Sequence, residues 1–179
     1  SSVITMISIG TGARIEAEQQ IERFGSNNLS VRSQSSSNRG VSMGANSVNT
    51  LTLKDMEALK EELPAIKAIA PRVSLSTQIV ANGNNWLATV TGTTNDYFDL
   101  GNWKFENGRS FEEEELASGS RVAIIGKTVQ KNLFDTDSPI DEVIRINKVP
   151  FTVIGLLDAK GGTAWADLDD TVIVPLKTA

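Results

Sequence analysis

The residues best suited to chemistry lie near the C-terminal end, where Asp167, Asp169 and Asp170 follow Gly161-Gly162 and Trp165. A loop that carries clustered carboxylates and an aromatic side chain is typical of a glycosidase or a metal-dependent hydrolase. A glycosidase, however, usually takes its two carboxylates from separate strand ends, since they must flank the scissile bond. We therefore predict a polar surface loop that caps the last strand. A carboxylate-dependent hydrolase, or a small-ligand-binding domain with Trp165 as its stacking residue, remains the alternative.

A second group of carboxylates is the run of four glutamates from Glu112 to Glu115. Such a run could bind Ca²⁺ or supply a pair of catalytic carboxylates. Consecutive residues on a helix point in different directions, so the four side chains do not converge on one ion. The run also lacks the spaced Asp, Asn and Gly residues of a calcium-binding loop. We predict the start of a solvated helix.

The composition excludes several kinds of enzyme. The 179 residues include no cysteine and no histidine, which removes thiolate catalysis, Cys-based zinc sites and the Ser-His-Asp relay. A Ser-Lys dyad would need Lys three residues after Ser, and the sequence has no such pair. The net charge of −5 argues against a nucleic-acid partner, because DNA and RNA attract basic surfaces. We predict that the domain binds no cofactor and no metal.

The elements that would position these residues are short. Apolar runs rich in Val and Ile, each closed by Gly, Pro or Asp, predict strands, and Asn82-Gly83 predicts a hairpin turn. Thr52 and Asp55 resemble a capping box at the start of a helix. Predicted strands cover residues 28–33, 66–73 (interrupted by Pro71), 75–81, 86–93, 121–126, 143–146, 151–157 and a final run from 171, and predicted helices cover 4–24, 53–63, 95–100 and 127–134.

Several segments, taken in order, resemble the extracytoplasmic core domain of MacB/FtsX-type ABC transporter permeases. No single segment is specific, but the ordered set spans nearly the whole chain. The sequence departs from the family at Asp141, where Gly is common. The matching segments are Ser2–Ala13, Leu29–Val31, Thr91–Thr93, Asp96–Phe98, Gly108–Phe111, Val122–Gly126, Leu133-Phe134, Ser138-Pro139, Ile144–Ile146, Phe151–Gly155, Lys160-Gly161 and Val172–Leu176.

The resemblance implies an α+β fold of two small mixed subdomains behind an N-terminal stalk helix. Residues 1–25 would form the stalk, which in the family continues from a membrane helix. Residues 26–93 would form the first half of the subdomain that the family calls Porter, a strand-helix-strand unit. Residues 94–179 would form the inserted β-rich subdomain called Sabre. We therefore expect the chain to be a fragment of a longer membrane protein.

The same resemblance implies a function without catalysis. The domain would lie in the periplasm or extracellular space as part of a protein of the inner cell membrane, and it would relay movement driven by ATP hydrolysis in a separate nucleotide-binding domain or subunit. Its implied partners are that cytoplasmic ABC ATPase, a second permease protomer, and a membrane-fusion adaptor, a lipoprotein carrier or a cell-wall enzyme. We expect Trp165, Asp167 and Asp169 to contact such a partner.

Overall fold

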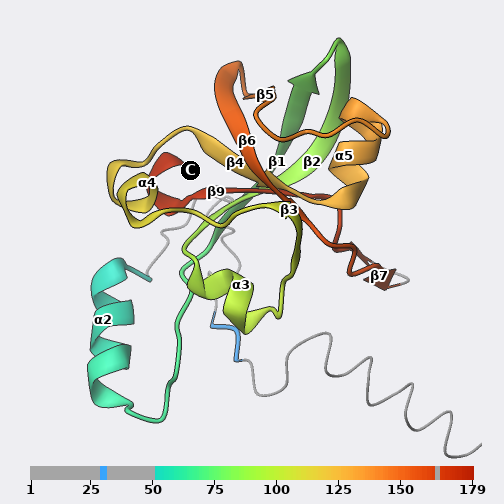
Figure 1. The fold of residues 1–179 in the computed structure, drawn as a ribbon. Helices are drawn as coiled ribbons and strands as arrows, with labels where there is room; N and C mark the ends of the chain where they lie inside the picture. Colours follow the sequence, from blue (N-terminus) through green and yellow to red (C-terminus); the bar gives the residue numbers. More distant parts are fainter. Residues whose placement is uncertain (1–28, 32–50, 164–165) are drawn as a thin grey trace, which may run out of the picture. The chain divides into compact units, whose positions relative to one another are not determined.

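A computed structural model describes residues 29–31, 51–163 and 166–179 (Figure 1). The stalk helix expected at residues 1–25 lies outside the described residues, as does Trp165. Residues 70–179 belong to one compact unit and residues 27–69 to another. The two units are described separately below. None of the helices in the described part of the chain is long and apolar enough to cross a membrane.

The larger unit is built around a closed β-barrel (Figure 1). Six strands follow one another in the order β5-β6-β4-β9-β2-β1, and β5 closes the ring by pairing with β1. A seventh strand, β3, lies outside the ring on the C-terminal half of β6. The strands are β1 (Val73–Ala81), β2 (Asn84–Thr93), β3 (Phe105–Gly108), β4 (Val122–Ile125), β5 (Val143–Ile146), β6 (Val149–Leu157) and β9 (Thr171–Pro175).

The hairpin between β1 and β2 has the turn that the sequence predicted. Ala81 pairs with Asn84, so Asn82 and Gly83 form a two-residue connection. Their φ angles are 51° and 78°, in the left-handed region that Asn and Gly tolerate and that this kind of tight hairpin requires. The register that follows from this turn runs without interruption to Val73 opposite Gly92.

Side chains on alternate positions of the strands form two separate hydrophobic clusters. Ile125 on β4 belongs to the cluster inside the barrel, and the adjacent Ile124 belongs to a cluster outside it. β9 does the same, with Val172 and Val174 inside and Ile173 outside. A bulge in β6 places Ile154 between residues that pair with Ala123 and Ile124. Both faces of β4 and β9 are therefore apolar, which explains their continuous runs of Val and Ile.

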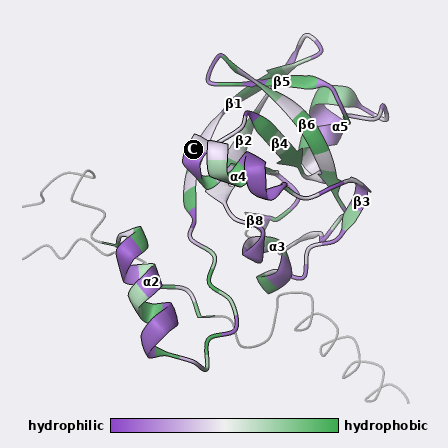
Figure 2. Cartoon of the chain, turned by 60° about the vertical axis from the view of Figure 1, so that its left-hand side comes forward, coloured by the Kyte–Doolittle hydropathy of each residue, from purple (hydrophilic) through white to green (hydrophobic). Residues whose placement is uncertain are grey.

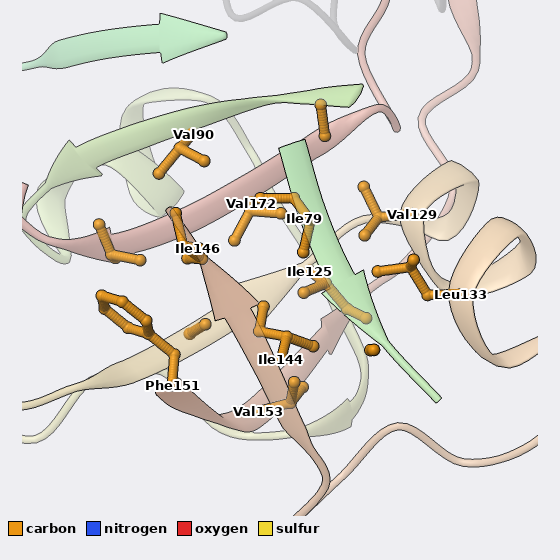
Figure 3. Close-up of a cluster of buried hydrophobic side chains, with 14 of the residues drawn as sticks. Ile79, Val90, Ile125, Val129, Leu133, Ile144, Ile146, Phe151, Val153 and Val172 are labelled. Carbon is orange, nitrogen blue, oxygen red and sulfur yellow. The ribbon is translucent and has the colours of Figure 1, made fainter. Parts of the chain in front are cut away.

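Helices complete both clusters. α5 (Lys127–Phe134) buries Val129, Leu133 and Phe134 against the inner cluster. Figure 3 shows Val129 and Leu133 projecting from α5 toward the strands that carry Ile79, Ile125 and Val172. On the outside, α3 (Asp96–Leu100) contributes Phe98, which packs against Phe105 and Phe111. α4 (Glu113–Ser118) and the short 3₁₀ helix η1 (Leu176–Thr178) complete the unit.

The smaller unit contains α2 (Leu53–Glu62). The expected capping box is present, because Thr52 and Asp55 exchange backbone and side-chain hydrogen bonds. Green and purple segments alternate along α2 in Figure 2, as in an amphipathic helix. None of the ten residues of α2 is buried, however. Apolar side chains line an open groove here, formed by Val31, Leu51, Asp55, Ala58, Leu59 and Glu62.

Several sequence predictions are confirmed and two are wrong. The α5 helix and the β5 strand have the predicted bounds. Residues 66–72 contain no strand, because Pro71 has no N–H to donate and β1 begins only at Val73. Residues 29–31, within the strand predicted at 28–33, are not in a strand either, and Leu29 is 89% exposed. Its alternating pattern has no apolar surface to cover it in the described residues.

The mixed α/β character is confirmed, and the expected subdomain boundary between residues 93 and 94 remains a prediction. A division between residues 93 and 94 would separate β2 from β9, and these strands pair in parallel from Thr89 opposite Thr171 to Thr93 opposite Pro175. One sheet therefore includes strands from both sides of that boundary. The two compact units divide near residue 70. The Porter and Sabre names remain an expectation from the resemblance.

Leu133 allows a direct test of the inner cluster. It is fully buried on α5, and a Leu→Ala change in a core costs about 2–5 kcal/mol of unfolding free energy. We expect Leu133→Ala to lose that amount in urea titrations. Leu87→Ala is the matched control, since Leu87 is 65% exposed and should change stability by about 0.5 kcal/mol or less. Equal effects of the two changes would contradict the described core.

Candidate functional site

The loop that carries the predicted carboxylates, residues 158–170, is called the acidic loop below. It contains two short strands, β7 (Gly162–Thr163) and β8 (Ala166–Asp167), which pair with each other and with no other strand of the described residues. β7 projects from the barrel near α5 (Figure 1, dark red). The sequence predicted a loop here but not this hairpin.

Asp169 anchors the base of the acidic loop. Its side chain is 7% exposed, and its two carboxylate oxygens accept hydrogen bonds from the backbone N–H groups of Lys160 and Gly161, at 2.9 and 3.0 Å. Its own N–H donates to a carboxylate oxygen of Asp167 at 2.9 Å. A carboxylate is well suited to this position, because both oxygens can accept at once. Asp169 therefore closes the loop rather than lying on its exposed rim.

The other two carboxylates attach the acidic loop to different parts of the barrel. Asp167 accepts a hydrogen bond from the Thr128 hydroxyl of α5 at 2.7 Å. Asp170 accepts one from the indole N–H of Trp86 on β2, also at 2.7 Å. Partial burial raises the pKa of the Asp170 carboxyl, the Trp86 hydrogen bond lowers it, and the charge of Asp167 raises it, with a net upward shift.

A glycine lets the acidic loop approach α5 closely. A β-carbon on Gly126 would lie 2.2 Å from the backbone oxygen of Asp169, which is far inside van der Waals contact. The same oxygen accepts a hydrogen bond from the N–H of Thr128 in the first turn of α5. Gly126 therefore serves neither a phosphate site nor a flexible hinge. It makes room for the backbone contact that joins α5 to the loop.

Lys160 joins the loop to the segment that follows α3. Its ammonium group lies 4.4 Å from the centre of the Trp103 ring and donates a hydrogen bond to the backbone oxygen of Gly101. Trp103 in turn stacks on Tyr97. Burial lowers the pKa of Lys160, and the Asp169 carboxylate partly offsets this effect. A cation over an indole face is favoured by the ring's negative charge distribution.

The predicted carboxylates are thus brought together, but each one holds a different part of the structure. Asp167, Asp169 and Asp170 accept from α5, from the loop backbone and from β2, respectively. Within the described ranges, no group of three or more Asp and Glu side chains is arranged to hold a metal ion. The geometry gives no support to the hydrolase alternative.

The glutamate run has the structural role that the sequence predicted. Glu112 is the N-cap of α4, and the other three residues form its first turn. Glu115 receives two parallel hydrogen bonds from the Arg109 guanidinium, at 2.8 and 2.9 Å, and a third from the Glu112 N–H. The hydrogen bonds from Arg109 lower the pKa of Glu115 although burial opposes this. The run starts a helix rather than forming an ion site.

Sequence reasoning missed Trp86, Gly126 and Lys160 as parts of this site. Trp86 and Asp170 are 84 positions apart, and no local pattern links them. The glycine at position 161 was the available sequence signal that the chain turns next to Lys160, since its φ of 76° is one that glycine adopts readily.

The comparisons with known proteins decide the family. The model of the MacB-like periplasmic core domain matches residues 1–179. The chain belongs to this family. It is 36% identical to a macrolide export ATP-binding/permease protein MacB of Chlorobium luteolum over 179 residues, and 38% identical to that of Chlorobaculum tepidum. In each case the match covers all of this chain but only 27% and 28% of the relative. The chain thus spans about a quarter of these MacB proteins.

Solved MacB-like periplasmic domains have the same fold. The periplasmic region of MacB from Actinobacillus actinomycetemcomitans matches with a TM-score of 0.63 and 23% identity, over 74% of this chain and 58% of that one. The extracellular domain of the YknZ transporter from Gram-positive bacteria matches with a TM-score of 0.62 and 24% identity, over 71% and 63%. These matches show the fold alone; it is the family match that makes the chain a periplasmic core domain of a MacB-like ABC transporter permease.

The anchor role of Asp169 predicts a specific effect of amide substitution. Asp169→Asn keeps the shape but replaces one acceptor oxygen with an NH₂ group, so one of the two backbone N–H groups loses its partner. We expect a loss of about 1–3 kcal/mol of unfolding free energy, as for a buried donor left unsatisfied. Amide hydrogen exchange should accelerate at Lys160 or Gly161. Unchanged exchange at both residues would contradict the anchor.

Asp170→Asn should have a different effect that depends on pH. A raised pKa means that folding favours the protonated carboxyl, so the ionised Asp170 lowers stability above its folded pKa, and this cost disappears as the pH falls below the unfolded pKa. Asparagine keeps an acceptor for Trp86 without the charge. We expect Asp170→Asn to be at least as stable as the wild type at pH 7, with any advantage shrinking toward pH 3. Urea titrations across this range, with Trp fluorescence, would measure it; a clear destabilisation at pH 7 would refute the assignment.

Proposed function

We propose that this domain is a non-catalytic relay that binds a partner protein or substrate outside the membrane. Movement would come from ATP hydrolysis in a separate nucleotide-binding part of the transporter. The observation that carries the proposal is the family match over the entire chain. The names of the relatives combine an ATP-binding part with a permease, which fits hydrolysis at a distance from this domain.

The barrel supports this role through its rigidity. Each strand of the ring pairs on both sides over at least part of its length, and side chains pack on both faces of β4 and β9. Two packed clusters and a closed ring of strands restrict internal motion of the barrel, because close-packed interiors are hard to deform. A domain of this kind transmits a push or rotation as a rigid body instead of absorbing it in internal rearrangement.

The acidic loop is the proposed contact for a partner. Asp167 lies on its exposed part, and Trp165 remains a candidate from the sequence alone. Asp169 would not touch the partner itself, because it is buried; it would hold the loop in place through its hydrogen bond from the loop backbone. The partners proposed for this loop are a second permease protomer, an adaptor, a lipoprotein carrier or a cell-wall enzyme outside the membrane. The cytoplasmic ATPase would be a partner only through the rest of the full-length permease.

The proposal can be tested in a full-length transporter that carries this chain as its periplasmic domain. Asp169→Asn loosens the acidic loop, so we expect export of a macrolide such as erythromycin to fall severalfold while ATP hydrolysis continues. Asp99→Asn is the matched control, because Asp99 is exposed on α3 and the charge change is the same. Export and hydrolysis would be measured on the same preparations in proteoliposomes.

Two results would contradict the relay. Normal export by Asp169→Asn would show that the acidic loop takes no part in it. An equal loss of hydrolysis and export would show that the domain does not act after hydrolysis. Only a loss of coupling, with the Asp99→Asn control unaffected, agrees with the proposal.

A further inference from the structure

Arg145 lies on the outward face of β5. Its neighbours Ile144 and Ile146 point into the barrel and are buried, so the side chain between them points outward and is exposed. Among the described residues, no ion pair or hydrogen bond involves the Arg145 guanidinium. By contrast, the Arg109 guanidinium forms a bidentate ion pair with the Glu115 carboxylate.

Apolar side chains surround Arg145 on the neighbouring strands. Val80 on β1 pairs with Arg145 from one side and Pro150 on β6 from the other, and paired residues share a face of the sheet. Val143 lies two residues earlier on β5, on the same face. Leu87 on β2 is a diagonal neighbour of Val80, because it pairs with Gln78. These five residues, Val80, Leu87, Val143, Arg145 and Pro150, are called the Arg145 patch.

The Arg145 patch is exposed although it is largely apolar. Leu87 is 65% exposed, Val143 51% and Val80 41%. Single exposed apolar residues are ordinary, but clusters across adjacent strands are typical of interaction sites. The surrounding sheet is also neutral, since β1 and β2 contain no charged residue from Val73 to Thr93. Arg145 is therefore the charged residue of the patch. The exposed Gln78 and Asn85, which pair with Leu87 and Val80, border it, and Lys148 lies in the turn between β5 and β6.

This combination selects one kind of ligand. A guanidinium binds a carboxylate through two parallel hydrogen bonds, and it is more weakly hydrated than an ammonium group. Apolar neighbours that exclude water strengthen such a pair, which is why Arg is enriched in the centres of protein interfaces. An acidic side chain flanked by apolar residues would therefore match both parts of the Arg145 patch.

We propose that the Arg145 patch binds a segment of a partner protein in which an Asp or Glu is flanked by apolar residues. This inference rests on the proposed function and specifies a second contact surface, apart from the acidic loop. A second copy of the same patch would bring two Arg145 side chains together, and like charges repel. An anionic membrane would need a cluster of basic residues, whereas the chain has a net charge of −5.

The test uses a phage library of random 12-residue peptides, selected on the immobilised 179-residue chain after depletion on the Arg145→Met variant. Selected peptides would be synthesised and their binding measured by calorimetry. We expect peptides with Asp or Glu beside apolar residues, and binding at least about tenfold weaker for Arg145→Met and for Leu87→Asp, the size of a hot-spot effect. Arg72→Met is the matched control. Arg72 is exposed and directly precedes the first residue of β1, whereas Val80 of the patch lies near the last residue of that strand, so this change should leave binding unchanged.

Several outcomes would overturn the inference. These are the absence of an enriched sequence, peptides without a carboxylate, and equal binding by the Arg145→Met variant. Peptides whose binding depends on Asp167 rather than Arg145 would move the contact to the acidic loop, and the proposed function would stand. A dimer of the chain in light scattering that Leu87→Asp dissociates would assign the patch to a second copy. Thermal unfolding of each variant, monitored by circular dichroism, confirms that the fold is retained.

Discussion

The pairing of β6 on both of its edges is the interaction on which the rest of the structure depends. One edge pairs with β4, and the other pairs first with β5 and then with β3. This strand therefore closes the barrel and also carries the outer layer. Closure forces alternate residues of β4 and β9 into two different cores, so both faces of these strands must be apolar. The bulge at Ile154 keeps Val153 and Leu156 in the inner cluster despite one extra residue.

The acidic loop is a consequence of this framework. The loop leaves the barrel after β6 and returns at β9, and its carboxylates bond to α5, to β2 and to its own backbone. These hydrogen bonds attach the loop to the barrel at several points, which would be useful for a domain that transmits movement.

The two proposed contact surfaces differ in physical character. The acidic loop is polar and charged, so its contacts would depend on ionic strength. The Arg145 patch is apolar with a central cation, so its contacts would derive from burial and one directed ion pair. A transporter domain that must bind and release a partner during each cycle could use the first surface for approach and the second for specificity.

The local elements follow from short stretches of sequence. The bounds of α5, the Asn82-Gly83 turn and the capping box at Thr52 all depend on residues within a few positions of each other. The strand predictions fail at residues 29–31 and 66–72, which shows the limit of such patterns, because a strand also needs a neighbour to pair with. The ring closure, the pairing of β2 with β9 and the anchoring role of Asp169 depend on tertiary contacts and could not be predicted. Each of these joins segments distant in the sequence, and short-range periodicity carries no information about which distant segments meet.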